Sequence, residues 1–348
     1  MNTIHRILAA LSITLVFGCL AWAQQPSVAP RVFINPGHGG HDSNDRPSPF
    51  FNVGVSDTVP YYESDSNILK GKSLMDILRK KGYEVMTTRV NNTSADDLDL
   101  FEIMSLAANS GADMFFAIHS NATGVKRKMN FPLGLYRGET GKPVAAGSDS
   151  ISRLIMNHLF ENRATSWTRD NPMLAGDWTF YDWGPKVGLG VLRYNKLPGL
   201  LSEGSFHDYI PERCRLLNHE YCWLEAWNQS LGIDDWFGKG NSYGKGVVAG
   251  RLLSKSSPRS DSDQLFGDDN YRPFNHARVT LSRGGKKQVY YTDYVENGFF
   301  LFPELEPGEY ELVAETAAAQ VLGRCKVTVS PNKVTYRNFL SEVPVGLN

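Results

Sequence analysis

The sequence predicts an α/β domain with a mostly parallel sheet and helices on both faces, followed by a small all-β sandwich domain. Between Arg31 and Gly238, short apolar runs alternate with longer segments whose apolar residues recur at helical spacing. From about residue 246 onward only short alternating runs remain, separated by turn residues such as Glu306-Pro307-Gly308. The first pattern is typical of helices packed on a parallel sheet, and the second of a small β-sandwich.

The elements of the α/β region follow from apolar spacing and from start and stop residues. The segment 63–81 has apolar residues at helical spacing and ends at Lys80-Lys81-Gly82, a cationic last turn with a glycine stop. A second helix is predicted at 94–109, with Ser94 as its N-cap and Asp96-Asp97 in its first turn. The expected strands are 32–34, 83–88, 113–118, 131–136, 189–192 and 200–202, and the further helices are 144–163 and 209–236.

Two predicted connections are unusually long. The segments 39–61 and 165–186 both exceed the length that a compact domain normally leaves without regular structure, and both are rich in aromatic residues, Pro, Asp and Gly. We expect them to form the rim of an active site; the alternative is that they are surface excursions. In the second loop Trp178, Tyr181 and Trp183 are candidates to stack on a sugar or a peptide, or to anchor their own loop.

The region after the α/β pattern is predicted as a separate unit. Residues 239–245 are rich in Gly, Ser and Asn and are predicted to be a linker, so the domain limits are 31–238 and 246–348. A polar insertion is expected at 254–275. The seven predicted strands are 247–253, 277–281, 288–292, 299–302, 310–314, 323–329 and 334–339.

The composition excludes some classes of partner. The 36 basic and 37 acidic residues are well mixed and give a net charge of −1. The chain has no basic arm, so we expect no nucleic-acid partner.

Residues 1–23 are predicted to be a signal peptide. An apolar core at residues 7–20 leads to Ala21-Trp22-Ala23, the small-x-small pattern of a signal-peptidase site. The core is shorter than the roughly 20 residues of a membrane span, so cleavage is favoured over a retained anchor, and the mature chain has no transmembrane span. Lipidation at Cys19 is the open alternative, although the bulky Phe17 disfavours it. We expect an exported protein that is periplasmic or associated with the cell envelope, with secretion as the alternative.

The remaining cysteines are predicted to be free thiols. Cys214 and Cys222 fall within one predicted helix, about 12 Å apart along its axis, which is too far for a disulfide. Together with Cys325 they make an odd number, which also argues against a disulfide framework.

Three residues are predicted to hold one zinc ion. His38 follows the first strand among three glycines, Glu63 begins a helix and His119 follows a later strand. Two histidines and a glutamate are an accepted ligand set for catalytic zinc, and the carboxyl ends of parallel strands lie along one edge of a sheet. The alternatives are loop hydrogen bonding for the histidines and a carboxylate favoured by the helix dipole for Glu63.

Three further histidines are weaker candidates. His41 and His207 are close enough in sequence to be rival ligands or neighbours of the ligands, although structural or solvent-facing positions are favoured. His158 lies in a helical pattern and is expected to contribute to packing.

Five short motifs in order resemble those of the zinc-dependent N-acetylmuramoyl-L-alanine amidases of the type 3 family. The motifs are Asn35-Pro36-Gly37-His38-Gly39-Gly40-His41-Asp42, Glu63 with Asn67-Ile68-Leu69, Val85 through Thr88-Arg89, Ala117-Ile118-His119-Ser120-Asn121-Ala122, and Leu201-Ser202-Glu203-Gly204-Ser205-Phe206. The resemblance covers roughly Arg31 to Phe237. It implies that His38, Glu63 and His119 are the zinc ligands and that Glu203 is the catalytic carboxylate.

The resemblance implies an exported enzyme that hydrolyses the amide between N-acetylmuramic acid and L-alanine in peptidoglycan. Glu203 is expected to accept the proton of the attacking water and to pass it to the departing amine. Glu203 could instead be a salt-bridged carboxylate, or exchange roles with Glu63. Two other functions stay open: a zinc peptidase acting on stem peptides, and a non-catalytic wall-binding protein.

Three departures from the family pattern and a second resemblance complete the sequence evidence. Asn35 stands where many family members have Asp, and Met104 replaces an arginine. The insertion between Asp42 and Glu63 is also longer than usual. The region from Gly246 to Leu340 resembles the carboxypeptidase-regulatory-like, transthyretin-like sandwich, which implies an accessory role. The sequence does not indicate a regulatory protein.

Overall fold

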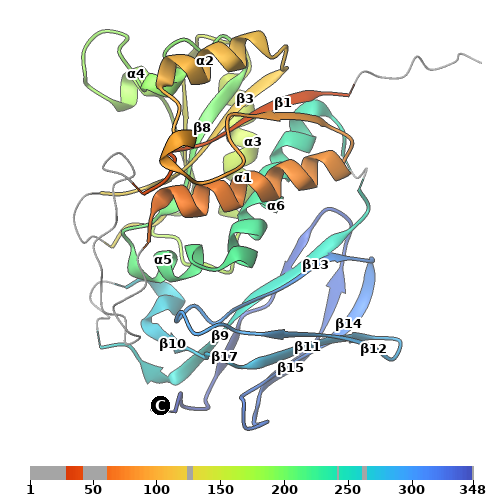
Figure 1. Ribbon diagram of the computed structural model, residues 1–348. Coiled ribbons are helices and arrows are strands. Elements are labelled where there is room, and N and C mark those ends of the chain that lie inside the picture. The colour runs from red at the N-terminus through yellow and green to blue at the C-terminus, as the bar shows by residue number, and fades with distance from the viewer. Residues whose placement is uncertain (1–28, 42–60, 124–127, 241–242, 261–264, 347–348) are drawn as a thin grey trace, which may run out of the picture.

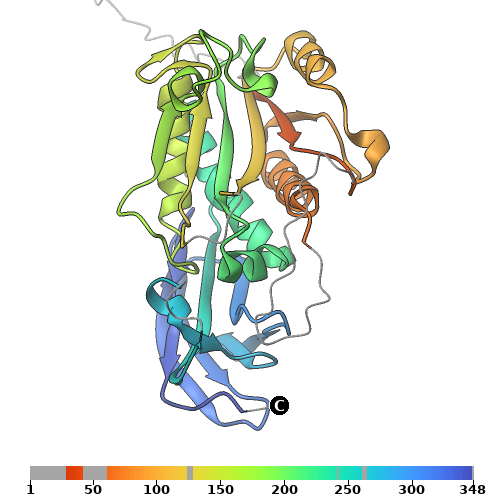
Figure 2. The same cartoon turned by 90° about the vertical axis from the view of Figure 1, so that its left-hand side faces the viewer.

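The computed structural model describes residues 29–41, 61–123, 128–240, 243–260 and 265–346. The predicted signal peptide and most of the first long loop lie outside these residues. Figures 1 and 2 show an α/β region at one end of the molecule and an all-β region at the other. Among the described residues, no helix combines the length and apolar character that crossing a membrane requires.

The α/β region is built on one six-stranded sheet in the order β2-β1-β3-β8-β4-β7. Strands β2, β1, β3 and β8 are parallel to one another, whereas β4 is antiparallel to β8 and parallel to β7. The predicted mostly parallel sheet is therefore confirmed. The strands are β1 (Arg31–Pro36), β2 (Glu84–Thr87), β3 (Met114–Asn121), β4 (Leu133–Tyr136), β7 (Met173–Gly176) and β8 (Gly199–Phe206), and two short strands, β5 (Gly138–Glu139) and β6 (Lys142–Pro143), pair separately.

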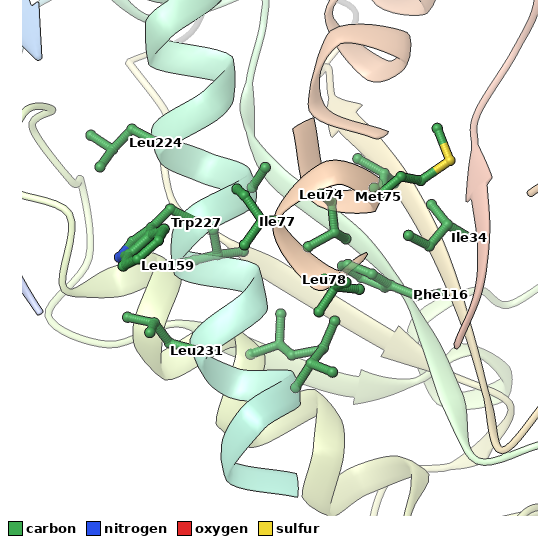
Figure 3. Close-up of a cluster of buried hydrophobic side chains, with 14 of the residues drawn as sticks. Ile34, Leu74, Met75, Ile77, Leu78, Phe116, Leu159, Leu224, Trp227 and Leu231 are labelled. Atoms are coloured by element: carbon green, nitrogen blue, oxygen red, sulfur yellow. The ribbon is translucent and has the colours of Figure 1, made fainter. Parts of the chain in front are cut away.

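Alternate residues of the central strands face opposite sides of the sheet, and each side is covered. Ile34 and Phe116 pack with α1 (Glu63–Lys80), α3 (Ser148–Phe160) and α6 (His219–Phe237), as Figure 3 shows for part of this cluster. Phe33 and Phe115 pack on the other side with α2 (Leu100–Asn109) and the segments around β7. This alternation follows from the two-residue period of a strand, and it makes the sheet a two-sided core.

The second predicted helix starts six residues later than expected. Asp99, not Ser94, is the N-cap of α2, because its carboxylate accepts hydrogen bonds from the backbone N–H groups of Phe101 and Glu102. Residues Ser94–Asp96 form a 3-10 turn instead. Gly39 and Gly40 pack directly against the backbone of this segment, at Asp97 and Ser94. This tertiary contact stabilises the 3-10 turn where the sequence predicts the first turn of the helix.

The segment before β8 also differs from the prediction. The expected strand at 189–192 is wrong: Gly190–Leu192 is a 3-10 helix. The second long loop contains the edge strand β7 and the short helix α4 (Asp177–Phe180), which the sequence analysis misses.

The two remaining helix predictions differ in their ends. The predicted helix 209–236 is two helices, α5 (Ile210–Leu216) and α6, because the Asn218 side chain accepts from the Tyr221 N–H and caps a new helix. The helix α3 is shorter at both ends than the predicted 144–163.

The C-terminal region consists of two β-sheets. In one, β9 pairs with β10, β13, β16 and β17; in the other the order is β12-β11-β14-β15. A cluster of buried apolar side chains lies between them. Part of the predicted polar insertion belongs to β9 and β10. The strands are β9 (Gly246–Pro258), β10 (Tyr271–Pro273), β11 (Arg278–Arg283), β12 (Lys286–Tyr291), β13 (Phe299–Leu305), β14 (Gly308–Glu315), β15 (Val321–Val329), β16 (Val334–Tyr336) and β17 (Phe339–Ser341).

The two regions share one hydrophobic cluster. Trp227 of α6 is fully buried and belongs to the same cluster as Val247 and Leu301 of the C-terminal sheet. The ring of Tyr221 meets that of Phe299 edge to face, with centroids 5.3 Å apart. The predicted linker at 239–245 therefore connects regions that pack closely on each other. The predicted domain limits themselves stay a prediction.

The predicted free thiols are confirmed for the described cysteines, although one reason was wrong. Cys214 and Cys222 lie in two different helices, α5 and α6, and not in one. Burial raises the pKa of the Cys214 thiol to about 11 and that of Cys222 to about 12. Both are therefore protonated at neutral pH and chemically inert.

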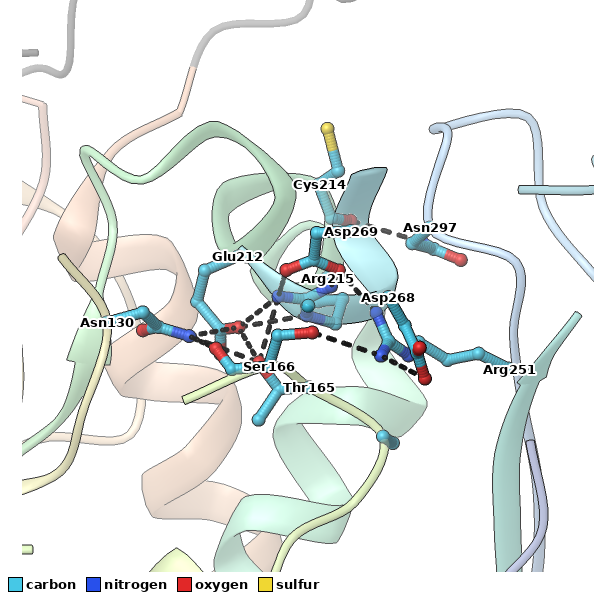
Figure 4. A network of polar contacts seen from close by, with 12 residues as sticks. Asn130, Thr165, Ser166, Glu212, Cys214, Arg215, Arg251, Asp268, Asp269 and Asn297 are labelled. Carbon is cyan, nitrogen blue, oxygen red and sulfur yellow. Dashed lines mark hydrogen bonds and ion pairs between the residues drawn. The ribbon is translucent and has the colours of Figure 1, made fainter. Parts of the chain in front are cut away.

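A buried network of charges joins the C-terminal region to the α/β region (Figure 4). The Arg215 guanidinium of α5 lies 2.7 Å from Glu212 and 2.9 Å from Asp269, and Arg251 of β9 also contacts Asp269. All four side chains are almost fully buried. Asn130 donates to the Glu212 carboxylate at 3.1 Å. Two cations and two anions balance, which is the condition for burying charge without a large penalty.

We expect Asp269→Asn to destabilise the protein at pH 7 by about 3–5 kcal/mol, because it leaves two buried guanidinium groups without their shared carboxylate. Burial alone would raise the pKa of Asp269, but Arg215 and Arg251 outweigh it and hold the pKa far below the usual value. Because the pKa of Asp269 is lower in the folded state, its ionised carboxylate stabilises the folded protein at pH values above the unfolded pKa of about 4. This contribution is lost as the pH falls further. Urea unfolding from pH 7 to pH 3 should show the difference between the two proteins narrowing below about pH 4; a constant difference would contradict this account.

Candidate metal and active site

The turn after β1 presents His38 in a left-handed backbone conformation. His38 has φ +59° and stands between two glycines. The Gly37 N–H donates to the Ile118 carbonyl at 2.9 Å, which ties the turn to β3. The buried Arg89 guanidinium donates to the carbonyls of Pro36 and Gly37 at 2.9 and 2.8 Å. A left-handed histidine is uncommon, and these contacts hold it there.

Glu63 is the first residue of α1 and its carboxylate is buried. Its Oε1 atom accepts hydrogen bonds from the Ser120 N–H at 3.0 Å and from the Asn67 side chain at 3.1 Å. Its Oε2 atom lies 3.2 Å from His38 Nε2. The positive end of the helix dipole favours a carboxylate at this position. One oxygen is thus anchored by the protein while the other faces His38.

His119 completes a group of three. Its Nδ1 atom lies 3.0 Å from Glu63 Oε1, and its ring meets that of His38 edge to face at 5.0 Å. One ligand atom from each of His38, Glu63 and His119 lies within 4.8 Å of the others, so the three could hold a metal ion. Two ligands of a tetrahedral zinc ion are about 3.3 Å apart, given bonds of about 2.0–2.1 Å. The 3.2 Å between His38 and Glu63 fits that spacing.

The charge states suit metal ligation. Burial alone would raise the pKa of Glu63, but hydrogen bonds with His119 and His38 outweigh it and hold the pKa well below its usual range. Burial also lowers the pKa of His119, although the Glu63 carboxylate opposes this. An anionic carboxylate and a neutral imidazole are the forms that bind a metal ion.

Glu203 lies on β8 directly opposite His119 of β3 in the parallel register. It lines a cavity of about 1270 Å³ together with His38, Glu63 and His119. The structure therefore brings all four predicted site residues to one edge of the sheet, where parallel α/β folds place their ligands.

His207 also lines this cavity. It is buried, its Nε2 atom is 4.0 Å from Glu63 Oε2, and its ring packs beside that of Tyr61 at 5.3 Å. It is not a member of the three-residue group, and a solvent-facing position is excluded. His41 instead pairs with Asp65 at 2.8 Å at the surface.

The helical pattern predicts that His158 contributes to core packing, but the structure places it outside the core. It is partly exposed and pairs with Asp235 of α6 at 2.8 Å. This side-chain contact links the helices α3 and α6.

Aromatic side chains form one wall of the cavity. Phe180, Tyr181 and Trp183 come from the second long loop, and Phe101 comes from the first turn of α2. The rings of Tyr181 and Trp183 stack at 4.1 Å, and the side chain of Trp183 is 56% exposed. Trp178, the third aromatic candidate, is not among the cavity-lining residues; Lys186 lies over its ring.

Arg89, Asn67 and Ser120 lie within the sequence motifs, but no role is predicted for them from sequence. In the structure Arg89 donates to the Gly37 carbonyl next to His38. Asn67 and the Ser120 N–H both donate to the Glu63 carboxylate. Two of the departures from the family pattern are single residues. Asn35 is buried and donates to the Thr88 hydroxyl at 3.0 Å. Met104 packs in the apolar cluster on the α2 side of the sheet.

Comparison with known proteins identifies the family of this chain and several similar proteins. Residues 32–229, which include all four site residues, match the Amidase_3 family of N-acetylmuramoyl-L-alanine amidases. The chain is 27% identical over 241 residues to YqiI, an uncharacterized protein of Bacillus subtilis, covering 68% of this chain and 99% of YqiI. It is 24% identical over 208 residues to the sporulation-specific N-acetylmuramoyl-L-alanine amidase of Bacillus subtilis, covering 60% and 68% of the two chains. An N-acetylmuramoyl-L-alanine amidase from Clostridium difficile 630 has 24% identity and a TM-score of 0.47, covering 61% of this chain and 98% of that chain.

We expect Gly37→Ala to destabilise the site through a clash with the His119 ring. A Cβ atom at Gly37 would lie 2.1–2.5 Å from three atoms of the His119 ring, closer than any tolerated contact. Overpacking of this kind costs about 1–3 kcal/mol. Thermal unfolding of Gly37→Ala, His119→Ala and the double variant measures the coupling: the glycine substitution should be nearly neutral once the imidazole is gone. An equal loss in both backgrounds would contradict the steric account.

Proposed function

Because the chain belongs to the N-acetylmuramoyl-L-alanine amidase family, we propose that it hydrolyses the amide bond between N-acetylmuramic acid and L-alanine in peptidoglycan with the help of zinc. One observation supports this most directly. His38, Glu63 and His119 meet at one edge of the sheet, and Glu203 lines the same cavity. A protein that only binds the wall has no need of an acid–base group beside a metal site.

His38, Glu63 and His119 would hold the metal ion. Two imidazoles and one carboxylate are the donor set of known catalytic zinc sites, which leave a position open for water or substrate. When bound, zinc acts as a Lewis acid and lowers the pKa of bound water from 15.7 toward 7. The Ser120 N–H and the Asn67 side chain keep the Glu63 carboxylate oriented.

Glu203 is proposed to move the proton. As a carboxylate it accepts a proton from the attacking water, and as an acid it returns that proton to the nitrogen of the departing L-alanine. It lies opposite His119 in the pairing of β3 with β8, at the same edge of the sheet as the proposed ligands. The cavity is large enough for both sides of the scissile bond, since it exceeds the usual volume of about 300–1,000 Å³ for small-ligand sites.

The proposed function also bears on the location of the protein and on the role of its C-terminal region. Peptidoglycan lies outside the cell membrane, so the function requires export, which the leader pattern at residues 1–23 would provide. The C-terminal all-β region is proposed as an accessory part of the enzyme, packed on α6 and α5.

We expect Glu203→Gln to lose about 10²- to 10⁴-fold in kcat while still binding one zinc ion per chain, because a general base contributes that much and the ligands are untouched. Purified muropeptides are digested, and the products are identified by mass spectrometry.

Amidase action by the unaltered chain releases a free lactyl carboxyl group and a free L-alanine amine. Cleavage within the stem peptide would indicate a zinc peptidase. Wall binding without cleavage, in zinc-replete buffer, would indicate a binding protein. His38→Ala is the matched variant that should lose zinc as well as activity.

We expect Trp183→Ala to raise KM for peptidoglycan about 2- to 12-fold, because an exposed aromatic side chain at a cavity wall contributes about 0.5–1.5 kcal/mol by stacking. Trp178→Ala is the control, since Trp178 belongs to the same loop but does not line the cavity. Initial rates over a range of substrate concentrations give both values. If Trp178→Ala raises KM as much as Trp183→Ala, anchoring of the loop explains the effect and not stacking on substrate.

A further inference from the structure

A fully buried lysine and glutamate lie directly behind the candidate metal site. Lys70 follows Glu63 by two turns of α1, and its side chain has no exposed surface. Its Nζ atom lies 3.1 Å from an oxygen of Glu225 on α6 and donates to the Ser120 hydroxyl at 2.8 Å. Glu225 also accepts from Gln229 at 3.2 Å. Burying such a pair is costly, and a hydrophobic pair of similar size is often at least as stable. The pair therefore calls for a reason other than stability.

The lysine acts on the residue that orients Glu63. Ser120 follows the proposed ligand His119, and its N–H donates to Glu63 Oε1 at 3.0 Å. The Lys70 ammonium binds the hydroxyl of that same residue. Lys70 thus fixes the position of the Ser120 N–H group, which binds the proposed ligand Glu63 and directly follows the proposed ligand His119.

The pairing of β3 with β8 is irregular at this point. His119 lies opposite Glu203, but Asn121 lies opposite Phe206, so two residues of β8 face Ser120 alone. This is a β-bulge, and in a bulge the regular ladder no longer sets the direction of the side chains. The two strands that carry His119 and Glu203 consequently need other contacts to fix their relative position there.

The glutamate supports the β8 side of the same bulge. A Cβ atom placed on Gly204 would lie 2.1 Å from Glu225 Oε1, so the carboxylate packs directly against the backbone of the residue after Glu203. Lys70 therefore holds Ser120 of β3, and Glu225 backs Gly204 of β8. Their ion pair joins the two supports.

We propose that Lys70 and Glu225 are positioning residues that set the geometry of the zinc site and of Glu203 across the β3–β8 bulge. The inference rests on the proposed function, because it assigns the pair to the metal site of that function. The pair touches neither substrate nor metal; it acts through Ser120 and Gly204. Residues that orient metal ligands typically change metal affinity by about 10- to 100-fold when they are replaced.

The chain contains a matched control. Lys81 follows the end of α1, its side chain is also fully buried, and it pairs with Asp234 of α6 at 2.5 Å and with the Ser230 hydroxyl at 2.8 Å. It joins the same two helices with the same chemical groups. It lies 18 residues after Glu63, about 27 Å along the helix axis. Lys81→Met therefore removes an equivalent buried ion pair far from the site.

The test measures zinc affinity by competition with a chromophoric chelator, alongside the melting temperature and steady-state kinetics. Lys70→Met should bind Zn²⁺ about 10- to 100-fold more weakly and lower kcat with little change in KM, whereas Lys81→Met should lower the melting temperature and leave zinc affinity within about twofold. Equal zinc affinity in the two variants would overturn the inference.

A double variant separates positioning from stability. Lys70→Met with Glu225→Met leaves no buried charge unpaired, so its melting temperature should recover relative to Lys70→Met. Its zinc affinity should stay low, and the absorption spectrum of its Co²⁺ form should differ from that of the unaltered chain, because Ser120 still lacks its donor. Recovery of zinc affinity together with stability would show that the pair is only structural. An unaltered chain that binds no zinc would overturn the proposed function and this inference together, whereas full affinity in Lys70→Met would overturn the inference alone.

Discussion

The site depends on the parallel pairing of β3 with β1 on one side and with β8 on the other. Because these strands run in the same direction, their carboxyl ends lie at one edge of the sheet. His38, His119 and Glu203 are 81 and 84 residues apart along the chain, counted from 38 to 119 and from 119 to 203. The register places the last two opposite each other. Only Glu63 comes from a helix, and it reaches the same edge because α1 begins there.

Buried charges recur throughout this fold, and each set joins elements that apolar packing alone would leave free to slide. Lys81 with Asp234 joins the far ends of α1 and α6, and Arg215 with Asp269 joins the two regions of the chain. Apolar contacts are tolerant of small displacements, whereas a buried ion pair loses most of its energy when its geometry is lost. Both kinds of contact therefore hold these elements together: the apolar clusters through buried area, and the ion pairs through a defined geometry.

Much of this could be predicted from the sequence, for reasons that are local. The predicted fold class and the family, and with the family the class of enzyme, are confirmed, because helical and strand periodicity are properties of short windows and five motifs stand in a fixed order. The late start of α2 at Leu100 was not predictable, since Gly39 and Gly40 contact Asp97 and Ser94 across 58 and 54 residues of sequence. The buried position of His207 and the bulge at Ser120 depend on strand register, which no single window of sequence contains.

The segment that precedes α2 forms part of the cavity wall. Asp97, Leu98 and Asp99 line the cavity in a stretch that the sequence pattern predicts as helix. The segment 94–97 packs against Gly39 and Gly40 beside His38, and the first residues of α2, Leu100 and Phe101, also line the cavity. The glycines around His38 therefore permit two close contacts: Gly37 leaves room for the His119 ring, and Gly39 and Gly40 let the 94–97 segment approach the turn. Both faces of the sheet stay covered, by α1, α3 and α6 on one side and by α2 on the other, so the site lies at the carboxyl edge of the sheet.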